Sequence, residues 1–240
     1  MLAQEYKSFK TYRESENTYL QSRGISKEIT DQYSSIKVDA RNNVVTPMYA
    51  HFEGKFVKSS SFDVCGYNQK LQSPLTKGKD GTPLEKPLKD LNKGNKSITI
   101  LNTDKQEEVK HIVTTEAFID GLSYVQANNL DPKNTVIIST NGQTSESSLN
   151  LVTELAEIYP SAEVILAYDN DDKGKTFAES TKVKIQRAKA HFSTAKDWNE
   201  ELQQRQKAQQ AQAQKEREAQ AHEKGKEVPQ IQSSRRERSR

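Results

Sequence analysis

The spacing of apolar residues divides the first part of the chain into two stretches of different character. Apolar residues recur at roughly helical spacing over residues 4–33, with an interruption at Gly24, so we predict two helices, the second over residues 26–33. The period then changes to two, and the runs NVVTPMYA and KFVKSSSFDV predict two strands joined by a turn at Glu53-Gly54. We therefore expect residues 1–67 to form a small α+β region.

Residues 98–202 alternate between strand patterns and helix patterns. The apolar runs SITIL, HIVTT, TVIIST and EVILAYD predict strands, and AFIDGLSYVQANN, SESSLNLVTELAEIY and KTFAESTKVKIQRAKA predict helices. Strands that are apolar on both faces must be covered on both sides, so we expect an α/β fold, a parallel sheet with helices on both faces. Ligands bind such sheets where the carboxyl ends of the strands meet the following helices.

Two further stretches show neither pattern. Residues 68–97 contain three prolines, three glycines and many lysines, which predicts a flexible loop or interdomain linker without regular structure. Residues 203–240 are a low-complexity tract rich in Gln, Ala, Lys and Glu with almost nothing apolar to bury. This composition predicts an isolated, fraying helix or disorder.

The composition agrees with a chain that folds only in part, because its hydrophobic content of 32% is low for a globular protein. The net charge of +3 is uneven: residues 203–240 have ten basic and five acidic side chains, which leaves −2 for residues 1–202. The basicity of the chain is therefore a property of its tail. The last arginines either contact phosphates without sequence preference or only keep the tail soluble. These residues are Arg235, Arg236, Arg238 and Arg240.

Several classes of protein are excluded by the composition. Cys65 is the only cysteine, so neither a disulfide-stapled fold nor a structural zinc finger is expected. The four histidines lie far apart in the sequence, which argues against a histidine-based metal site. No apolar run approaches the roughly 18–20 residues of a membrane span, and the N-terminus has no signal-peptide pattern. We expect a cytoplasmic protein without a membrane partner.

Acidic residues follow two of the predicted strands. Glu116 comes after HIVTT, and the run DNDD at residues 169–172 comes after EVILAY. Side chains two positions apart on an extended segment point the same way, so Asp169 and Asp171 would converge and repel each other unless a cation lay between them. All-oxygen ligation suits Mg²⁺ or Mn²⁺, and with Glu116 at the same sheet edge the set would suit metal-assisted phosphoryl transfer.

A simpler interpretation of the same residues stays open. The DNDD run is also typical of a solvated turn with capping carboxylates, and Glu116 at the start of a helix would complement the helix dipole. Asp120 lies one helical turn after Glu116 and is expected to act around the site rather than as a ligand. Asn141-Gly142, after TVIIST, is a turn pair that lets the backbone approach a ligand closely.

At this point the sequence resembles a known family. The segments VTTEAFIDGLS, IISTNG and ILAYDNDDKGKTFAE are similar to the Toprim domain of primases, topoisomerases and related nucleases, which has a glutamate after one strand and DxD, then a glycine, after a later one. The late motif KDWNEEL resembles the version found in plasmid and mobile-element proteins. The segment that contains YLQSRGISKEITDQY is similar to the region that precedes Toprim in those proteins, so the resemblance covers about residues 10–202.

The resemblance implies a Toprim-like, Rossmann-like sheet with Glu116 as an acid/base or metal-linked residue and Asp169 and Asp171 as Mg²⁺ or Mn²⁺ ligands. We further expect a set of residues around the site or near a bound phosphate. These are Asp120, Asn141, Gly142, Asp172, Gly174, Lys196 and Asp197. Trp198 of the closing motif is read either as a packing anchor, which is more common, or as a platform for base stacking.

Three functions are compatible with this pattern. The leading expectation is primase-like nucleotidyl transfer on nucleic acid, DNA more than RNA, in plasmid or mobile-element replication or transfer. A Toprim nuclease would use the same carboxylates, and a third alternative is a non-catalytic DNA-binding accessory module. Because the chain lacks a zinc module, a domain with a nucleophilic tyrosine and a relaxase histidine cluster, the resemblance implies work with partners, such as a relaxase, a helicase or other transfer and replication proteins.

Overall fold

The computed structural model describes residues 2–50, 64–101 and 108–226. The described chain divides into two units, residues 1–202 and residues 203–240, and each is treated separately below. The expected strand KFVKSSSFDV and the turn at Glu53-Gly54 fall almost wholly outside the described residues, as do the four arginines of the tail.

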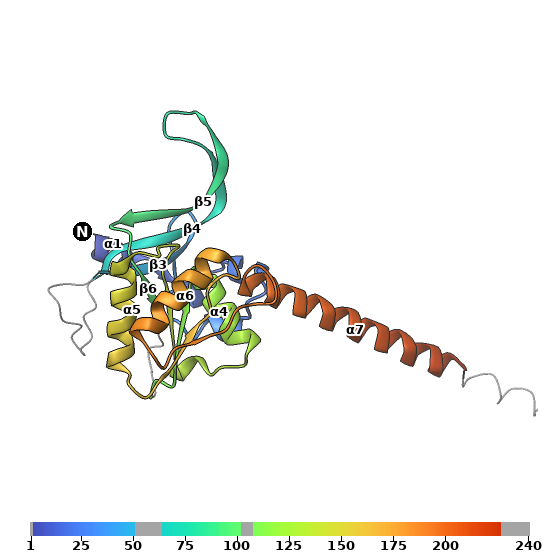
Figure 1. Cartoon of the computed structure of the whole chain (residues 1–240). Helices are drawn as coiled ribbons and strands as arrows, with labels where there is room; N and C mark the ends of the chain where they lie inside the picture. The colour runs from blue at the N-terminus through green and yellow to red at the C-terminus, as the bar shows by residue number, and fades with distance from the viewer. Residues whose placement is uncertain (1, 51–63, 102–107, 227–240) are drawn as a thin grey trace, which may run out of the picture. The chain divides into compact units, whose positions relative to one another are not determined.

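The first unit contains two sheets, which Figure 1 shows with the helices that cover them. The first sheet is antiparallel, with strand order β1-β2-β3-β4-β5. Its strands are β1 (Lys10–Thr11), β2 (Lys37–Val38), β3 (Val44–Tyr49), β4 (Val64–Lys77) and β5 (Pro83–Gly94). The helices before β3 are α1 (Leu2–Ser8), the 3₁₀ turn η1 (Tyr12–Glu14), α2 (Tyr19–Ser22) and α3 (Lys27–Thr30).

The second sheet has the order β10-β9-β7-β8-β6, with β10, β9, β7 and β8 parallel and β6 antiparallel at the edge. The strands are β6 (Thr99–Leu101), β7 (His111–Thr115), β8 (Thr135–Ser139), β9 (Glu163–Leu166) and β10 (Lys189–Ala190). The helical elements between and after them are α4 (Phe118–Ala127), η2 (Pro132–Asn134), α5 (Glu146–Ile158), α6 (Asp172–Lys184) and α7 (Trp198–Lys226). The expected α/β fold with a parallel sheet is confirmed.

Alternating residues of the second sheet face two different cores, which explains why its strands are apolar throughout. Ile112 of β7 and Val164 of β9 pack with α5 and α6 on one face. On the other face, Ile137 of β8 packs with α4 and with residues of the N-terminal region. The sheet is therefore covered on both sides, as its sequence pattern requires.

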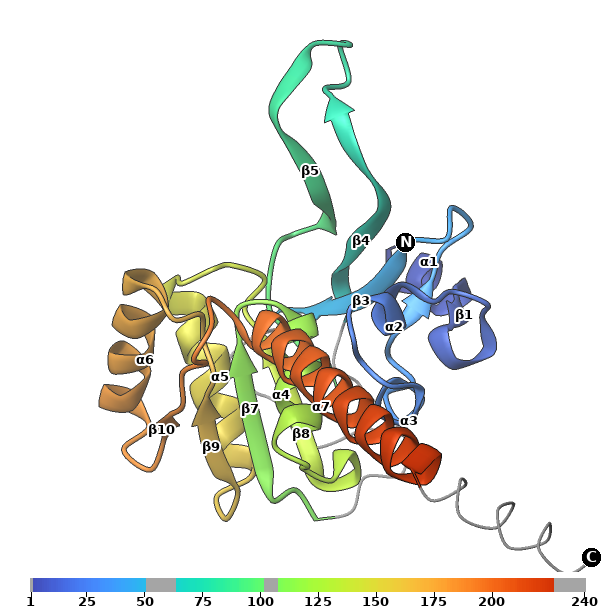
Figure 2. The same cartoon turned by 90° about the vertical axis from the view of Figure 1, so that its right-hand side faces the viewer.

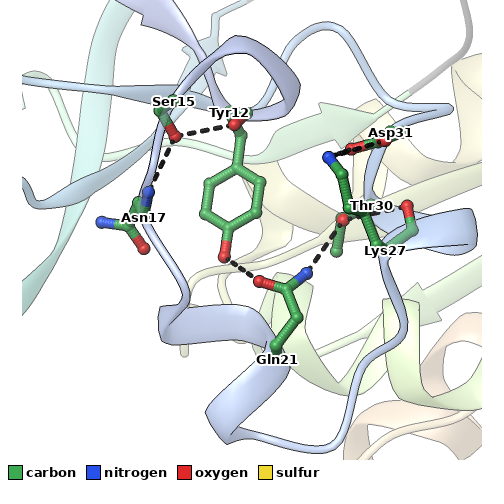
Figure 3. Close-up of polar contacts among 7 residues, drawn as sticks. All are labelled: Tyr12, Ser15, Asn17, Gln21, Lys27, Thr30 and Asp31. Carbon is green, nitrogen blue, oxygen red and sulfur yellow. Dashed lines mark hydrogen bonds and ion pairs between the residues drawn. The ribbon is translucent and has the colours of Figure 1, made fainter.

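The N-terminal region differs from the expectation of two helices over residues 4–33. The chain forms four short helical pieces separated by extended segments, and Gly24 breaks it with a φ of 82°. A polar network joins these pieces (Figure 3): the Tyr12 hydroxyl donates to Gln21 Oε1, and Gln21 Nε2 donates to Thr30 Oγ1. The aromatic residues at helical spacing thus anchor several short segments, and β3 confirms the strand predicted from NVVTPMYA.

The expected loop over residues 68–97 is wrong. Strands β4 and β5 form a long antiparallel hairpin across most of this stretch, joined by a turn at Gly78–Thr82 in which Gly81 has a φ of 85°. Beyond Leu71 both strands are almost wholly exposed, so no buried face imposes an alternating pattern on the sequence. The pairing register shifts between Lys70 and Leu75, in the stretch that contains Pro74.

The two sheets meet through β3 and β6. A backbone bridge pairs Tyr49 with Ile98, and the hydroxyls of Thr46 and Thr99 lie 3.5 Å apart. Figure 2 shows the β4–β5 hairpin projecting from this junction, on the side of the unit toward which β7 runs. The hairpin is thereby tied to the sheet whose carboxyl ends were expected to carry the site.

A smaller difference concerns the last helix predicted within residues 98–202. The helix expected over residues 175–190 ends at Lys184, and β10 follows it. The Arg187 guanidinium donates to the carbonyls of Ala156, Tyr159 and Ala162, which holds the chain in an extended loop before β10.

In the second unit the residues of α7 from 207 to 222 are exposed, and no helix in the described ranges is long and apolar enough for a bilayer crossing.

Candidate active site

Neighbouring parallel strands bring the predicted carboxylates to one edge of the second sheet. Strands β7 and β9 pair in parallel, with Ile112 opposite Val164, so both end at the same edge. Glu116 follows β7 directly, Asp169 lies three positions beyond the end of β9, and Asp171 is the N-cap of α6. The expected placement of all three at the carboxyl ends of strands is what the structure has.

Glu116 is half-buried at this edge, and two nearby carboxylates disfavour its negatively charged form. Burial, followed by the negative charges of Asp169 and Asp171, raises the pKa of Glu116 to about 7, against the opposing effect of Lys173 and Lys196. Its Oε1 atom is buried and accepts no hydrogen bond from the described residues. A buried carboxylate oxygen without a donor requires an explanation, and a bound water or ion is one that fits a site of this kind.

Asp169 and Asp171 occupy the turn between β9 and α6. Burial, then the charges of Asp197 and Asp171, raise the pKa of Asp169 to about 6, and Lys196 opposes this. The exposed Asp171 caps α6, because its carboxylate accepts a hydrogen bond of 2.8 Å from Gly174 N. A Cβ on Gly174 would lie 2.2 Å from the Asp169 carbonyl oxygen, so only glycine lets the helix start this close to the loop. Asp172 is the exposed first residue of α6.

The Asn141-Gly142 turn holds the main chain of Glu116 in place. The Glu116 carbonyl accepts hydrogen bonds from Gly142 N at 3.1 Å and from the Ser139 hydroxyl at 2.9 Å. Both turn residues have positive φ, 53° for Asn141 and 71° for Gly142. Asn141 Nδ2 also donates to Ser97 O at 2.7 Å, next to β6. The turn therefore positions the catalytic candidate from the neighbouring strand.

Asp120 is buried, with 8% of its surface exposed, and it meets the closing KDWN motif. Its Oδ1 accepts a hydrogen bond of 3.1 Å from Asn199 N, and Asn199 Nδ2 donates to Arg23 O and to Ser123 Oγ. Burial and the charges of Asp197 and Asp169 raise the pKa of Asp120 to about 7, opposed by the Asn199 hydrogen bond and by Lys70. The structure thus gives the motif a role that its sequence did not reveal: Asn199 ties α4, α7 and the N-terminal region together.

Lys196 and Asp197 lie beside the same loop. Asn170 N donates to Lys196 O at 3.0 Å, and Asp197 Oδ1 accepts from Glu200 N at the start of α7. The electrostatic influence of Lys196 on both Glu116 and Asp169 places a cation next to the carboxylates. Lys173 acts on Glu116 in the same way and was not singled out from the sequence, although it stands inside the DNDDKG run.

Trp198 serves as a packing anchor. Its side chain is 1% exposed and packs with Val113 and Ile165 of the sheet. The Tyr124 and His191 rings meet it edge-on, with centroids 4.7 and 4.9 Å away. A ring enclosed in this way offers no face to a nucleobase, so the stacking alternative is not supported.

The carboxylates do not form a complete metal-binding site. In the part of the chain that the structure describes, no three Asp, Glu, His or Cys side chains are gathered so that they could hold a metal ion. A groove of about 520 Å³ lies elsewhere, at the base of the hairpin, between Tyr67, Gln69 and Arg41, and none of the three carboxylates lines it.

A family model described as Toprim-like matches residues 113–202. Residues 113–202 are similar to a Toprim-like domain. This domain holds β7 from Val113, β8, β9, the helices that follow them and all three carboxylates. A comparison with curated protein sequences finds no match.

Two solved structures, both of bacteriophage T7 proteins, are similar to the chain at low identity. The primase fragment of the primase-helicase protein has 18% identity and a TM-score of 0.43, with 75% of this chain and 66% of that one covered. A lagging-strand DNA polymerase complex with primase domains bound to an RNA/DNA hybrid has 19% identity and a TM-score of 0.45, with 75% and 81% covered. The chain thus spans slightly less than two thirds of the first of these.

Proposed function

We propose that this chain is a divalent-metal-dependent enzyme that acts on nucleic acid, by primase-like nucleotidyl transfer. The observation that carries the proposal is the placement of Glu116, Asp169 and Asp171 at one carboxyl edge of the parallel sheet, in the Toprim-like region. Glu116 and Asp169 are partly buried and Asp171 is exposed, and like charges near one another are unfavourable unless a cation compensates for them. A fold that maintains this arrangement supports cation binding there.

The residues present fit Mg²⁺ or Mn²⁺ in their chemistry. All candidate ligands are carboxylate oxygens, which these ions prefer, and the buried Oε1 of Glu116 lacks a donor among the described residues. A bound cation would relieve the repulsion that raises the pKa values of Glu116 and Asp169. Since the side chains are not gathered on one point, metal binding would have to draw them together, and Asp171 would share its carboxylate between the metal and the cap of α6.

The roles of the protein groups follow from their positions. Asp169 and Asp171 would hold the metal, which would stabilise charge on the attacking and leaving oxygens of a phosphoryl transfer. Glu116, half-buried beside them, would assist proton transfer or share the metal. Lys196 and Lys173 would offer positive charge to a phosphate that approaches this edge.

The proposal is tested by measuring Mg²⁺-dependent incorporation of nucleotides on a single-stranded DNA template. The double variant Asp169→Asn, Asp171→Asn should lose activity by about 100-fold or more, because it removes two metal ligands. The matched control is Asp131→Asn, Glu163→Gln, which removes two carboxylates at the amino ends of β8 and β9. Equal activity of wild type and the Asp169, Asp171 variant would contradict the proposal.

The same preparations separate the two alternatives. Shortened labelled DNA in the presence of Mn²⁺ without nucleotides would identify a nuclease that uses the same carboxylates. Binding without either reaction would identify an accessory module. We further propose a place in plasmid or mobile-element DNA replication or transfer beside a helicase or relaxase, which rests only on the motif resemblance and is tested by co-purification with such proteins.

A further inference from the structure

The β4–β5 hairpin is an exposed arm that the proposed chemistry does not use. Leu71 is the last buried residue of β4, and six more strand residues extend beyond it to Lys77, a reach of about 20 Å at strand rise. Figures 1 and 2 both show the hairpin standing clear of the rest of the first unit. A two-stranded ribbon with no sheet or helix packed on it is only marginally stable by itself. Its outer half therefore contributes little to the core and is free to bind a partner.

The arm concentrates positive charge in an otherwise acidic unit. Residues 64–96 contain seven lysines and three acidic residues, a net charge of +4. Since residues 1–202 together carry −2, the remainder of the unit carries −6. Lys70 forms an ion pair with Asp90 at 2.5 Å near the base. The exposed lysines run along the arm and its turn: Lys77, Lys79, Lys86, Lys89 and Lys93.

The base of the arm lies close to the carboxylate edge. Lys70 on β4 lowers the pKa of Asp120, the buried carboxyl of α4 that hydrogen-bonds to Asn199. Figure 2 shows the arm rising from the side toward which β7 runs, and β7 ends at Thr115, directly before Glu116. A polymer that passes the carboxylates would therefore find the arm next to them.

We propose that the β4–β5 hairpin is a nucleic-acid-binding arm that holds the phosphate backbone of the strand on which the carboxylate site acts. The proposal rests on the proposed function for the identity of that strand. The charge pattern supports it, because a row of lysines binds phosphates through counterion release, without sequence preference. The acidic remainder of the unit repels nucleic acid, so the arm would direct it. Leu75, Leu84 and Leu88, at least 36% exposed, would pack against sugars or bases.

The test compares two triple variants of the full-length chain. The arm variant is Lys77→Gln, Lys86→Gln, Lys89→Gln; the control is Lys110→Gln, Lys133→Gln, Lys189→Gln, which removes the same charge at the amino ends of β7, β8 and β10. Affinity for a labelled 30-nucleotide single strand and for the matching duplex is measured by fluorescence anisotropy in EDTA at several salt concentrations. Residues 203–240 are present in the wild type and in both variants, so they contribute equally to the measured affinities.

The arm variant should bind at least about tenfold more weakly at low salt, and the slope of log K against log salt should fall by about 2 for the single strand, at about 0.7 per lost phosphate contact. The control should keep the wild-type slope. Equal slopes in the two variants would overturn the proposal. Which substrate loses more affinity tells whether the arm holds a single strand or a duplex.

Two further outcomes are distinguishable. If the arm variant binds DNA like wild type while Leu75→Ser, Leu84→Ser, Leu88→Ser changes the mass of the particle in light scattering, the arm docks a second copy of the chain and the proposal is overturned. Because binding is measured without metal, the result does not depend on catalysis. If the Asp169, Asp171 variant incorporates nucleotides normally, the proposed chemistry is refuted. If the arm variant in the same experiments binds DNA more weakly, the proposal for the arm still holds.

Discussion

The parallel sheet of the Toprim-like domain and the β4–β5 hairpin are both made of strands, yet they are held together differently. In the parallel sheet, most strand residues are buried in the cores on its two faces, and residues such as Ile112 and Val164 have no exposed surface. In the outer hairpin, the strands pair only with each other, and their side chains are exposed on both faces. Burial stabilises the first region, whereas local backbone pairing and turn geometry maintain the second.

The largest contrast is expected from shortening one apolar side chain in each region. Ile112→Ala opens a cavity between β7, α5 and α6 and should lower the free energy of unfolding by about 2–5 kcal/mol. Leu88→Ala, at a side chain that is 41% exposed, should lower it by about 0.5 kcal/mol or less. Urea unfolding followed by circular dichroism measures both. Equal losses would show that the hairpin is packed against something in solution.

This contrast also explains which parts of the fold the sequence predicts. The strands β7, β8 and β9 were predicted because burial on both faces imposes continuous apolar runs such as TVIIST. The hairpin was missed because exposed strands impose no pattern, and its prolines and lysines are typical of loops. Tyr6 and Tyr12 have helical spacing, but they lie in different elements and pack in different cores, Tyr6 beside Val45 and Tyr12 beside Leu20.

The candidate site also has features that the sequence predicts and features that it does not. Glu116, Asp169 and Asp171 were placed correctly at the carboxyl ends of strands, because that position follows from the order of strands and helices alone. The bond between Asp120 and Asn199 joins residues 79 positions apart, and no local pattern encodes such a contact. The gathering of the carboxylates around a metal stays a prediction, since the described side chains do not form such a group.

A second contrast concerns one glycine in each region. Gly174→Ala would place a Cβ 2.2 Å from the backbone oxygen of Asp169, so backbone must move, and we expect a loss of about 1–3 kcal/mol. Gly81 in the hairpin turn has a φ of 85° but open space around it, so Gly81→Ala should lose only about 1 kcal/mol, from backbone strain. Thermal unfolding at one pH compares them, and a larger loss at Gly81 would contradict the tight fit of α6 against the loop.

A further expected effect is on the pH dependence of stability. Asp120 has its folded pKa raised to about 7 from 3.8, so its contribution is fully present below pH 3.8 and is lost as pH rises toward and through 7. Asp120→Asn keeps an oxygen for Asn199 N and does not titrate, so it should flatten this decline by at most about 1.4 kcal/mol per pH unit. Urea unfolding at several pH values between 4 and 7 measures it. A variant that declines as steeply as wild type would contradict the buried state of Asp120.

The hydrogen bond from Asn199 Nδ2 to the Arg23 carbonyl has a consequence for the order of folding. The two residues are 176 positions apart, so a ribosome must synthesise almost the whole first unit before this contact can form. Contacts of such long sequence separation form late, after the loop between them has been closed. The α2–α3 turn and the buried Asp120 would be locked only at that stage. During synthesis the carboxylate edge would therefore remain open until the KDWN segment has emerged and closed it.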